Sequence, residues 1–220
     1  FGRNKLTNIT IPDSVTSIGE RAFSENQLTG VVIPGIETLG RDVFFGNPLS
    51  TLVLGDGFTS IVNNAFGDLE LTSVNIPEGV TSIGAGAFSG NKLSSITIPD
   101  SVTVIGDRAF QNNRLTNVTI PDSVTVIGER AFQNNRLTSI DIPSSVTNIS
   151  YYAFESNMLT DLTIPDTVIY IRGYAFQNNR LTALTLGENT ESIDKYAFRF
   201  NRLTSVTIPD SVTNIYIGAF

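Results

Sequence analysis

Apolar and polar positions along the chain follow a pattern that repeats about every 22 residues. Each unit reads L-T-x-[VI]-x-I-P-D-S-V-T-x-I-G-x-x-A-F-x-x-N-x, with few departures. The leucine that opens the unit stands at Leu6, Leu28, Leu49, Leu71, Leu93, Leu115, Leu137, Leu159, Leu181 and Leu203. Only the second interval is shorter, at 21 residues, because the turn after Pro34 lacks one residue. Such fixed spacing indicates a stack of equivalent units.

Two other columns keep the same period. The phenylalanine column comprises Phe1, Phe23, Phe44, Phe66, Phe88, Phe110, Phe132, Phe154, Phe176, Phe198 and Phe220. The asparagine column comprises Asn4, Asn26, Asn47, Asn91, Asn113, Asn135, Asn157, Asn179 and Asn201, and only Leu69 breaks it. We expect the phenylalanines to be buried. We expect each asparagine amide to satisfy backbone groups that no strand partner reaches.

The order of residues within a unit predicts its local structure. Leu-x-x-Val-x-Ile places alternate apolar side chains on one face of a short strand. The following proline ends the strand, since it has no N–H to donate. Val-Thr-x-Ile predicts a second extended stretch, and Gly-Asp/Glu-x-Ala-Phe predicts one short helical or 3₁₀ turn.

One unit exposes too much apolar surface to fold alone, whereas stacked units bury each other's faces and pair their strands in parallel. The sequence therefore predicts a repeat solenoid of the leucine-rich-repeat kind. We expect a right-handed curved rod, with a parallel β-sheet on one face and short extended or 3₁₀ segments on the other. Residues 1–220 would form one solenoid of about ten units. Neither end carries a polar capping unit, so we expect a fragment of a longer array or head-to-tail self-association.

The unit resembles the BspA-type leucine-rich repeat of bacterial and protist surface proteins. The matching stretches are "LTSVTIPDSV", "TVIGDRAF" and "QNNRLTNVTIPDSVTVIGERAF", and the resemblance extends over essentially the whole chain. It implies an extracellular, cell-surface location, between an export signal and a surface anchor. It also implies adhesion to host matrix, host cells or other bacteria.

Composition removes several classes of function. The chain has no Cys, His or Trp, which excludes the usual zinc and iron–sulfur sites and the Ser–His and Cys–His nucleophile pairs. The formal net charge of −7 argues against a nucleic-acid partner. No apolar run is long enough for membrane insertion. An acidic column after the proline could hold cations such as calcium, but it lacks the dense ligand spacing of a dedicated loop and turn formation explains most of it. We therefore expect no enzyme activity, no cofactor and no metal site.

The outward column of the predicted strands is the first candidate surface. Thr predominates there, and Val32, Val53, Asn75 and Asp141 vary it. Solenoids of this kind bind partners on this face, so Thr119, Asp141, Thr163 and Thr185 are candidate ligand-binding residues. The alternative is that Thr is simply a good strand residue at exposed positions.

Tyrosines form the second candidate surface, because all six lie in the C-terminal third of the chain. Tyr152, Tyr174 and Tyr196 share one slot in consecutive units, so stacking would align them in a stripe flanked by Arg172 and Lys195. Tyr and Arg are common at binding hot spots, and aromatic rings suit glycan stacking. The alternative is that the rings stack on one another and only stabilise the rod.

These observations predict a non-enzymatic surface binding module or adhesin, which contacts a protein or glycan on a host or bacterial surface. The alternative is a structural stalk, sheath or filament segment. The near identity of units five and six favours the structural role. The tyrosine stripe favours binding.

Overall fold

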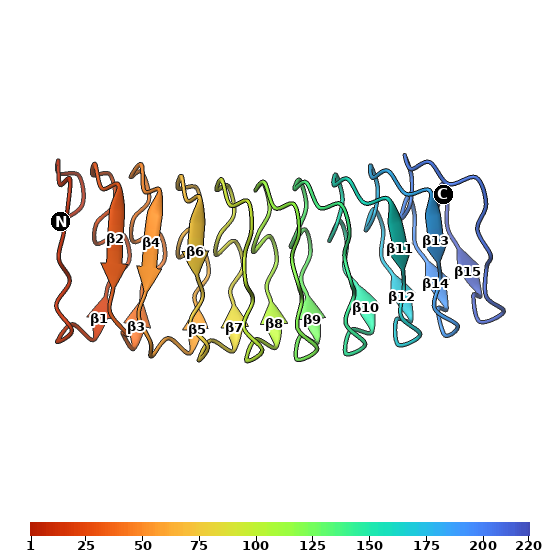
Figure 1. Cartoon of the computed structure of the whole chain (residues 1–220), viewed down its shortest axis with the longest axis horizontal. Helices are drawn as coiled ribbons and strands as arrows, with labels where there is room; N and C mark the ends of the chain where they lie inside the picture. Colours follow the sequence, from red (N-terminus) through yellow and green to blue (C-terminus); the bar gives the residue numbers. More distant parts are fainter.

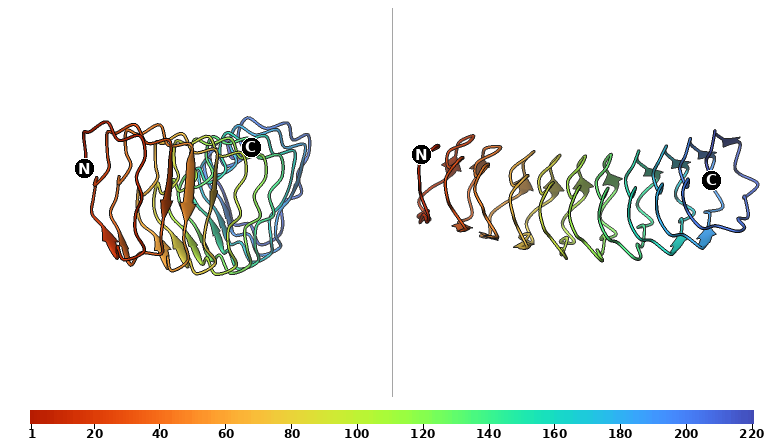
Figure 2. Two further views of the ribbon diagram at one scale, coloured as in Figure 1. Left: turned by 60° about the vertical axis from the view of Figure 1, so that its left-hand side comes forward. Right: turned by 90° about the horizontal axis from the view of Figure 1, so that it is seen from above.

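The computed structural model describes residues 1–220 as successive coils that lie side by side along one long axis. We number the coils by their opening leucines, from coil 1 at Leu6 to coil 10 at Leu203. The two termini lie at opposite ends of the rod (Figure 1). Views from the side and from above show coils of similar outline standing one behind another (Figure 2). The predicted repeat solenoid is confirmed.

The first extended stretch of the coil forms short parallel strands with an exposed face. These are β2 (Gly30–Ile33), β4 (Thr51–Leu54), β6 (Ser73–Asn75), β11 (Asp161–Thr163) and β13 (Ala183–Thr185), in the upper row of Figure 1. Side chains of β4 alternate between exposed and buried, as a strand with one face on the core requires. Pairing is interrupted in the middle of the rod, where one isolated bridge joins Thr97 to Thr119.

The second extended stretch forms a longer ladder of two-residue strands. Its members are β1 (Ser17–Ile18), β3 (Thr38–Leu39), β5 (Ser60–Ile61), β7 (Ser82–Ile83), β8 (Val104–Ile105), β9 (Val126–Ile127), β10 (Asn148–Ile149), β12 (Tyr170–Ile171), β14 (Ser192–Ile193) and β15 (Asn214–Ile215). They occupy the lower row of Figure 1. All pairs are parallel, in three groups: β1-β3, β5-β7-β8-β9 and β10-β12-β14-β15. Both extended parts of the coil thus contribute to the stacking.

The phenylalanine column forms a continuous stack in the core over most of the rod. The ring of Phe110 is fully buried between Phe88 and Phe132, with centroids at 5.6 and 5.4 Å. The backbone is linked at the same place, because the N–H of Phe110 donates to the carbonyl oxygen of Ala131 in the next coil at 2.9 Å. Apolar burial and inter-coil hydrogen bonds therefore act together in each coil.

The asparagine column forms a hydrogen-bond ladder through the interior, as expected. Nδ2 of Asn113 donates to the carbonyl oxygens of Phe88 at 2.8 Å and Phe110 at 3.2 Å. Its Oδ1 accepts from the N–H of Leu93 at 3.1 Å. Each buried asparagine therefore satisfies carbonyl groups of two coils and one N–H, which would otherwise be costly to bury.

The segment before and after the buried phenylalanine forms hydrogen-bonded turns, so the predicted helical or 3₁₀ turn is wrong. In coil 6, the N–H of Ala131 donates to the carbonyl of Gly128 and that of Gln133 to Arg130, both at 3.2 Å. Arg130 and Asn134 have left-handed backbone, with φ of 57° and 55°. A right-handed helical turn cannot contain such residues, and the chain instead turns twice around the phenylalanine.

The glycine of Ile-Gly lets neighbouring coils approach closely. A Cβ on Gly128 would lie 2.5 Å from the backbone nitrogen of Asp107, and one on Gly106 would lie 2.7 Å from that of Ala85. Val62 and Ser150 replace this glycine in coils 3 and 7. The ladder breaks at those two coils, between β3 and β5 and between β9 and β10. Arg172, Asp194 and Tyr216 replace the same glycine in coils 8 to 10, where β10, β12, β14 and β15 stay paired, so loss of the glycine does not by itself break the ladder.

The junction between coils 2 and 3 is the weaker of the two. On the outer face, coils 2 and 3 are joined, because β2 and β4 pair over four residues. Behind that face, β3 and β5 are unpaired, Phe44 and Phe66 are not stacked, and the N–H of Phe44 has no acceptor. Val62 for glycine and Leu69 for asparagine place bulkier side chains at this one junction. The coils remain joined along the outer face and by the backbone hydrogen bond from Asp42 to Asn64 at 3.1 Å, but the phenylalanine stack and the inner ladder are interrupted between them.

Candidate functional site

The candidate residues of the outward strand column lie on the surface, as the alternation predicts. Thr119, Asp141, Thr163 and Thr185 are all exposed. Thr163 and Thr185 are cross-strand partners in β11 and β13, whereas Thr119 takes part only in the isolated bridge and Asp141 lies outside any strand. They form a polar strip of small side chains.

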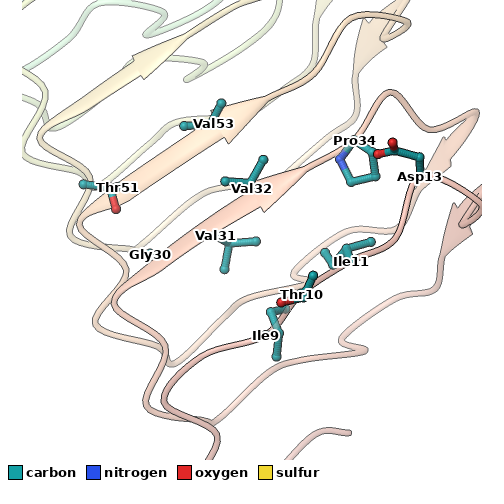
Figure 3. Close-up of a pocket in the computed structure, with 10 residues that line it drawn as sticks. All are labelled: Ile9, Thr10, Ile11, Asp13, Gly30, Val31, Val32, Pro34, Thr51 and Val53. Atoms are coloured by element: carbon teal, nitrogen blue, oxygen red, sulfur yellow. The ribbon is translucent and has the colours of Figure 1, made fainter.

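A groove with mixed polar and apolar lining interrupts this face at its N-terminal end (Figure 3). Val32 of β2 and Val53 of β4 are direct cross-strand partners and are 61% and 52% exposed. The groove has a volume of about 410 Å³, and Gly30 and Thr51 line it beside the two valines. A Cβ on Gly30 would lie 2.6 Å from Oγ1 of Thr51, so a larger residue here would require the Thr51 side chain to change rotamer. The sequence shows both valines as departures but does not show the groove, which depends on how coils 1 to 3 lie together.

The tyrosine stripe (Tyr152, Tyr174 and Tyr196) forms as aligned rings. Tyr152 and Tyr174 are stacked with centroids 4.5 Å apart and planes 7° apart. Tyr174 and Tyr196 lie 5.2 Å apart and are tilted by 42°. Each of these residues has positive φ, the backbone conformation that Arg130 has in the same slot of coil 6.

The ring faces of the tyrosine stripe are already covered. The guanidinium of Arg130 lies 4.3 Å from the centroid of Tyr152, on a ring that also stacks against Tyr174. At the other end, Tyr196 packs over Gly218, where a Cβ would lie 2.7 Å from the ring carbons, and Arg199 lies 4.9 Å from the ring centroid. The stripe therefore offers ring edges and hydroxyl groups to a ligand, with little free face for stacking.

Packing within the stripe also affects the acidity of one hydroxyl. Burial raises the pKa of Tyr152 above its ordinary value of 10.0, and the neighbouring Tyr174 and Glu155 raise it further. The positive charge of Arg130 acts in the opposite direction. The hydroxyl of Tyr152 therefore stays protonated as a hydrogen-bond donor over the whole neutral range.

The guanidinium of Arg172 contacts residues outside the tyrosine stripe. Its Nε donates to Oδ1 of Asn148 at 3.0 Å, and its guanidinium lies 4.7 Å from the ring centroid of Tyr170. A looser ion pair joins it to Asp194 at 3.9 Å. Lys195 does lie near the stripe, with Nζ 5.7 Å from the centroid of Tyr174. Arg172 belongs to a neighbouring column, the one that is glycine in most other coils.

A second groove opens beside Arg172 near the C-terminal end of the rod. We call it the corner groove; it has a volume of about 390 Å³ and is lined by Tyr151, Arg172, Asp194, Lys195, Tyr216 and Ile217. Sequence reasoning did not select Tyr151 or Tyr216 as site residues. The available signal was the loss of the Ile-Gly glycine in coils 7 to 10, where Ser150, Arg172, Asp194 and Tyr216 stand instead. Stacking places these substitutions and their neighbours on one corner of the rod.

No group of three or more His, Cys, Asp or Glu side chains is arranged to hold a metal ion. No helix in the structure has the length and apolar character needed to cross a bilayer.

Comparisons with known proteins identify the same repeat. A family model described as the BspA type leucine rich repeat region matches residues 1–115 and 103–220, in 6 copies. No curated protein sequence matches the chain.

Solved structures with a similar fold come from several bacteria. A leucine-rich repeat protein from Eubacterium ventriosum has a TM-score of 0.66 and 23% identity over 98% of this chain, which spans only 64% of that protein. A leucine rich cell surface protein from Faecalibacterium prausnitzii has a TM-score of 0.54 and 27% identity over 99% of this chain and 79% of its own. The pneumococcal vaccine antigen PcpA has a TM-score of 0.61 and 21% identity over 98% of this chain and 70% of its own. The family model covers every residue of the chain, which therefore belongs to the BspA-type leucine-rich repeat family.

Proposed function

We propose that this chain is a non-enzymatic binding module of a bacterial surface protein, which attaches to a protein or glycan on a host or neighbouring cell. The observation that carries the proposal is the corner of coils 7 to 10, where tyrosines and cations gather in an otherwise repetitive surface. We call this the C-terminal corner; it combines the tyrosine stripe and the corner groove. Tyr and Arg are enriched where binding energy concentrates.

The residues of this corner are not needed for stacking. Coils 5 and 6 stack on one another with Gly106-Asp107-Arg108 and Gly128-Glu129-Arg130 at the equivalent positions. The phenylalanine and asparagine columns are the same in those coils and in coils 7 to 9. Because these columns stabilise the rod in either case, the altered corner supports a role in binding.

Family membership supports display on the cell surface, and composition supports the lack of catalysis. One structurally similar protein is described as a cell surface protein and another as a vaccine antigen. The absence of His and Cys removes the commonest general bases and nucleophiles.

The test compares the native chain with a variant that restores the consensus at the corner. This consensus variant carries Arg172→Gly, Gly173→Glu, Tyr174→Arg, Asp194→Gly, Lys195→Glu and Tyr196→Arg. The same triplet stacks normally in coil 6, so the variant should fold. Its control carries Ala85→Glu and Gly86→Arg, which introduce that triplet into coil 4.

Binding is measured on surfaces coated with matrix proteins or mucin-type glycans, and thermal unfolding is followed for all three proteins. We expect the consensus variant to lose binding and the coil 4 control to retain it. Equal binding by a folded consensus variant would exclude the C-terminal corner.

A structural role is the second candidate, favoured by the near identity of coils 5 and 6, which differ at four of 22 positions. Such uniformity is suited to length rather than to a single binding surface. End-to-end polymers in electron micrographs, together with no binding to any coated surface, would favour this role.

A further inference from the structure

The corner groove differs from the tyrosine stripe in having an uncovered aromatic ring. Tyr151 is 42% exposed, and its ring is neither stacked by another ring nor covered by a cation. Tyr151 lies against Gly173, where a Cβ would come 3.3 Å from its Cε1. A free aromatic face beside a polar hydroxyl suits the C–H face of a sugar ring, which is apolar between its hydroxyl groups.

The cations of the corner groove are suited to a carboxylate. Arg172 is held in place by Asn148, Tyr170 and Asp194, so its position is fixed before any ligand arrives. Its Nε is engaged by Asn148, while its terminal nitrogens have only the loose contact with Asp194. A planar guanidinium is the preferred partner of a carboxylate, and Lys195 adds a second positive charge.

The charge of the groove contrasts with that of the whole protein. Two cations and one carboxylate line it, whereas the chain as a whole carries −7. Asp194 can accept hydrogen bonds from ligand hydroxyl groups. The volume of about 390 Å³ lies at the lower end of the range for small-molecule pockets, so it suits one or two sugar residues.

We infer that the corner groove binds an acidic pyranose, with the sugar ring against Tyr151 or Tyr216 and its carboxylate at Arg172 and Lys195. This inference rests on the proposed binding function and names the ligand class for one part of that surface. The sugar is a sialic acid or a uronic acid at the end or within a glycan chain, since both present a carboxylate on a pyranose ring.

Calorimetry on the full chain distinguishes sialic acid from uronic acid as the ligand and tests whether binding requires the carboxylate. The probes are sialyllactose, a glucuronate-containing hyaluronan tetrasaccharide, neutral lactose and the methyl ester of sialyllactose. We expect one acidic probe to bind at least about tenfold more tightly than lactose, with its affinity falling as salt rises. If sialyllactose is the better acidic probe, its methyl ester should bind as weakly as lactose. Equal affinity for acidic and neutral sugars would overturn the inference.

Substitutions of lining residues test whether the acidic probe binds in the corner groove. Lys195→Gln and Tyr216→Ser change exposed side chains and should each weaken the acidic probe by about tenfold. Arg172→Gln should abolish binding. The matched control is Arg180→Gln, an exposed arginine of coil 8 outside the groove, which should leave affinity unchanged. Undiminished binding by folded Lys195→Gln and Tyr216→Ser proteins would exclude the groove.

The two proposals fail in different ways. If no acidic probe binds but the consensus variant still loses adhesion to coated surfaces, the sugar inference is wrong and the binding function stands. If the consensus variant adheres as the native chain does, the proposed function of this corner is wrong.

Discussion

Leu69 stands where an asparagine oxygen would accept a hydrogen bond from the backbone N–H of Leu49. The equivalent N–H of Leu71 donates to Oδ1 of Asn91 at 3.0 Å, whereas that of Leu49 has no acceptor although Leu49 is fully buried. A buried unsatisfied N–H destabilises a fold by about 1–3 kcal/mol. Coil 3 therefore lacks an interaction that the rest of the array repeats.

Leu69→Asn should stabilise the protein. The amide would satisfy Leu49 and add donors to the carbonyls of Phe44 and Phe66, which outweighs the lost apolar burial of Leu69. We expect a gain of about 1 kcal/mol, measured as a higher urea midpoint. The reverse change in a complete coil, Asn113→Leu, should cost about 3 kcal/mol, because three buried backbone groups lose their partner. A neutral Asn113→Leu would mean that the ladder contributes little.

The interrupted hydrogen bonding between coils 2 and 3 should be visible by hydrogen exchange. The N–H groups of Phe44 and Leu49 have no acceptor, whereas those of Phe110 and Leu115 donate to Ala131 and Asn135. We expect exchange at Phe44 and Leu49 to be roughly tenfold faster or more, since amides with few partners open locally. Equal protection at the two sites would show that the junction is closed in solution.

Phe110→Ala should remove a central part of the core. The ring is fully buried and stacked on both sides, so we expect a loss of about 3–5 kcal/mol in unfolding free energy. Phe200 is 62% exposed and lies outside the column, so Phe200→Ser is the control and should change stability little. A small effect at Phe110 would contradict the stacked core.

Gly128→Ala tests the close approach of coils. Its Cβ would lie 2.5 Å from the backbone of coil 5, so the coils must separate, at a cost of about 1–3 kcal/mol. Gly19 holds the same slot in coil 1, with no atom within 4 Å of its Cβ. Gly19→Ala should therefore be neutral or slightly stabilising. Chemical unfolding of both variants shows whether a change in stability comes from the contact between coils or from the replacement of glycine by alanine itself.

Tyr152 should lose its proton later than an ordinary tyrosine, because burial raises its pKa above 10.0. Below pH 10 the hydroxyl is protonated in both the folded and the unfolded chain, so it does not alter stability. Above that pH the unfolded chain loses the proton first, so the unfolding free energy falls as pH rises through the folded pKa. Ultraviolet titration should show a late tyrosinate step that Tyr152→Phe removes. Titration of all tyrosines together would contradict this assignment.

The sequence by itself determined the architecture, because the 22-residue period fixes which side chains face the core in every coil. The phenylalanine stack, the asparagine ladder, the exposed strand column and the alignment of Tyr152 with Tyr174 all follow from register alone. The position of a residue within the repeat is enough to show which column it belongs to.

Tertiary structure decided the features that depend on how closely two coils approach. Sequence does not show that the inner ladder and the phenylalanine stack are interrupted between coils 2 and 3, or that the guanidinium of Arg172 lies over Tyr170. The corner groove likewise arises from side chains of adjacent columns in four coils. Periodicity places residues along a column, whereas distances across columns depend on backbone spacing and side-chain packing, which the three-dimensional structure supplies.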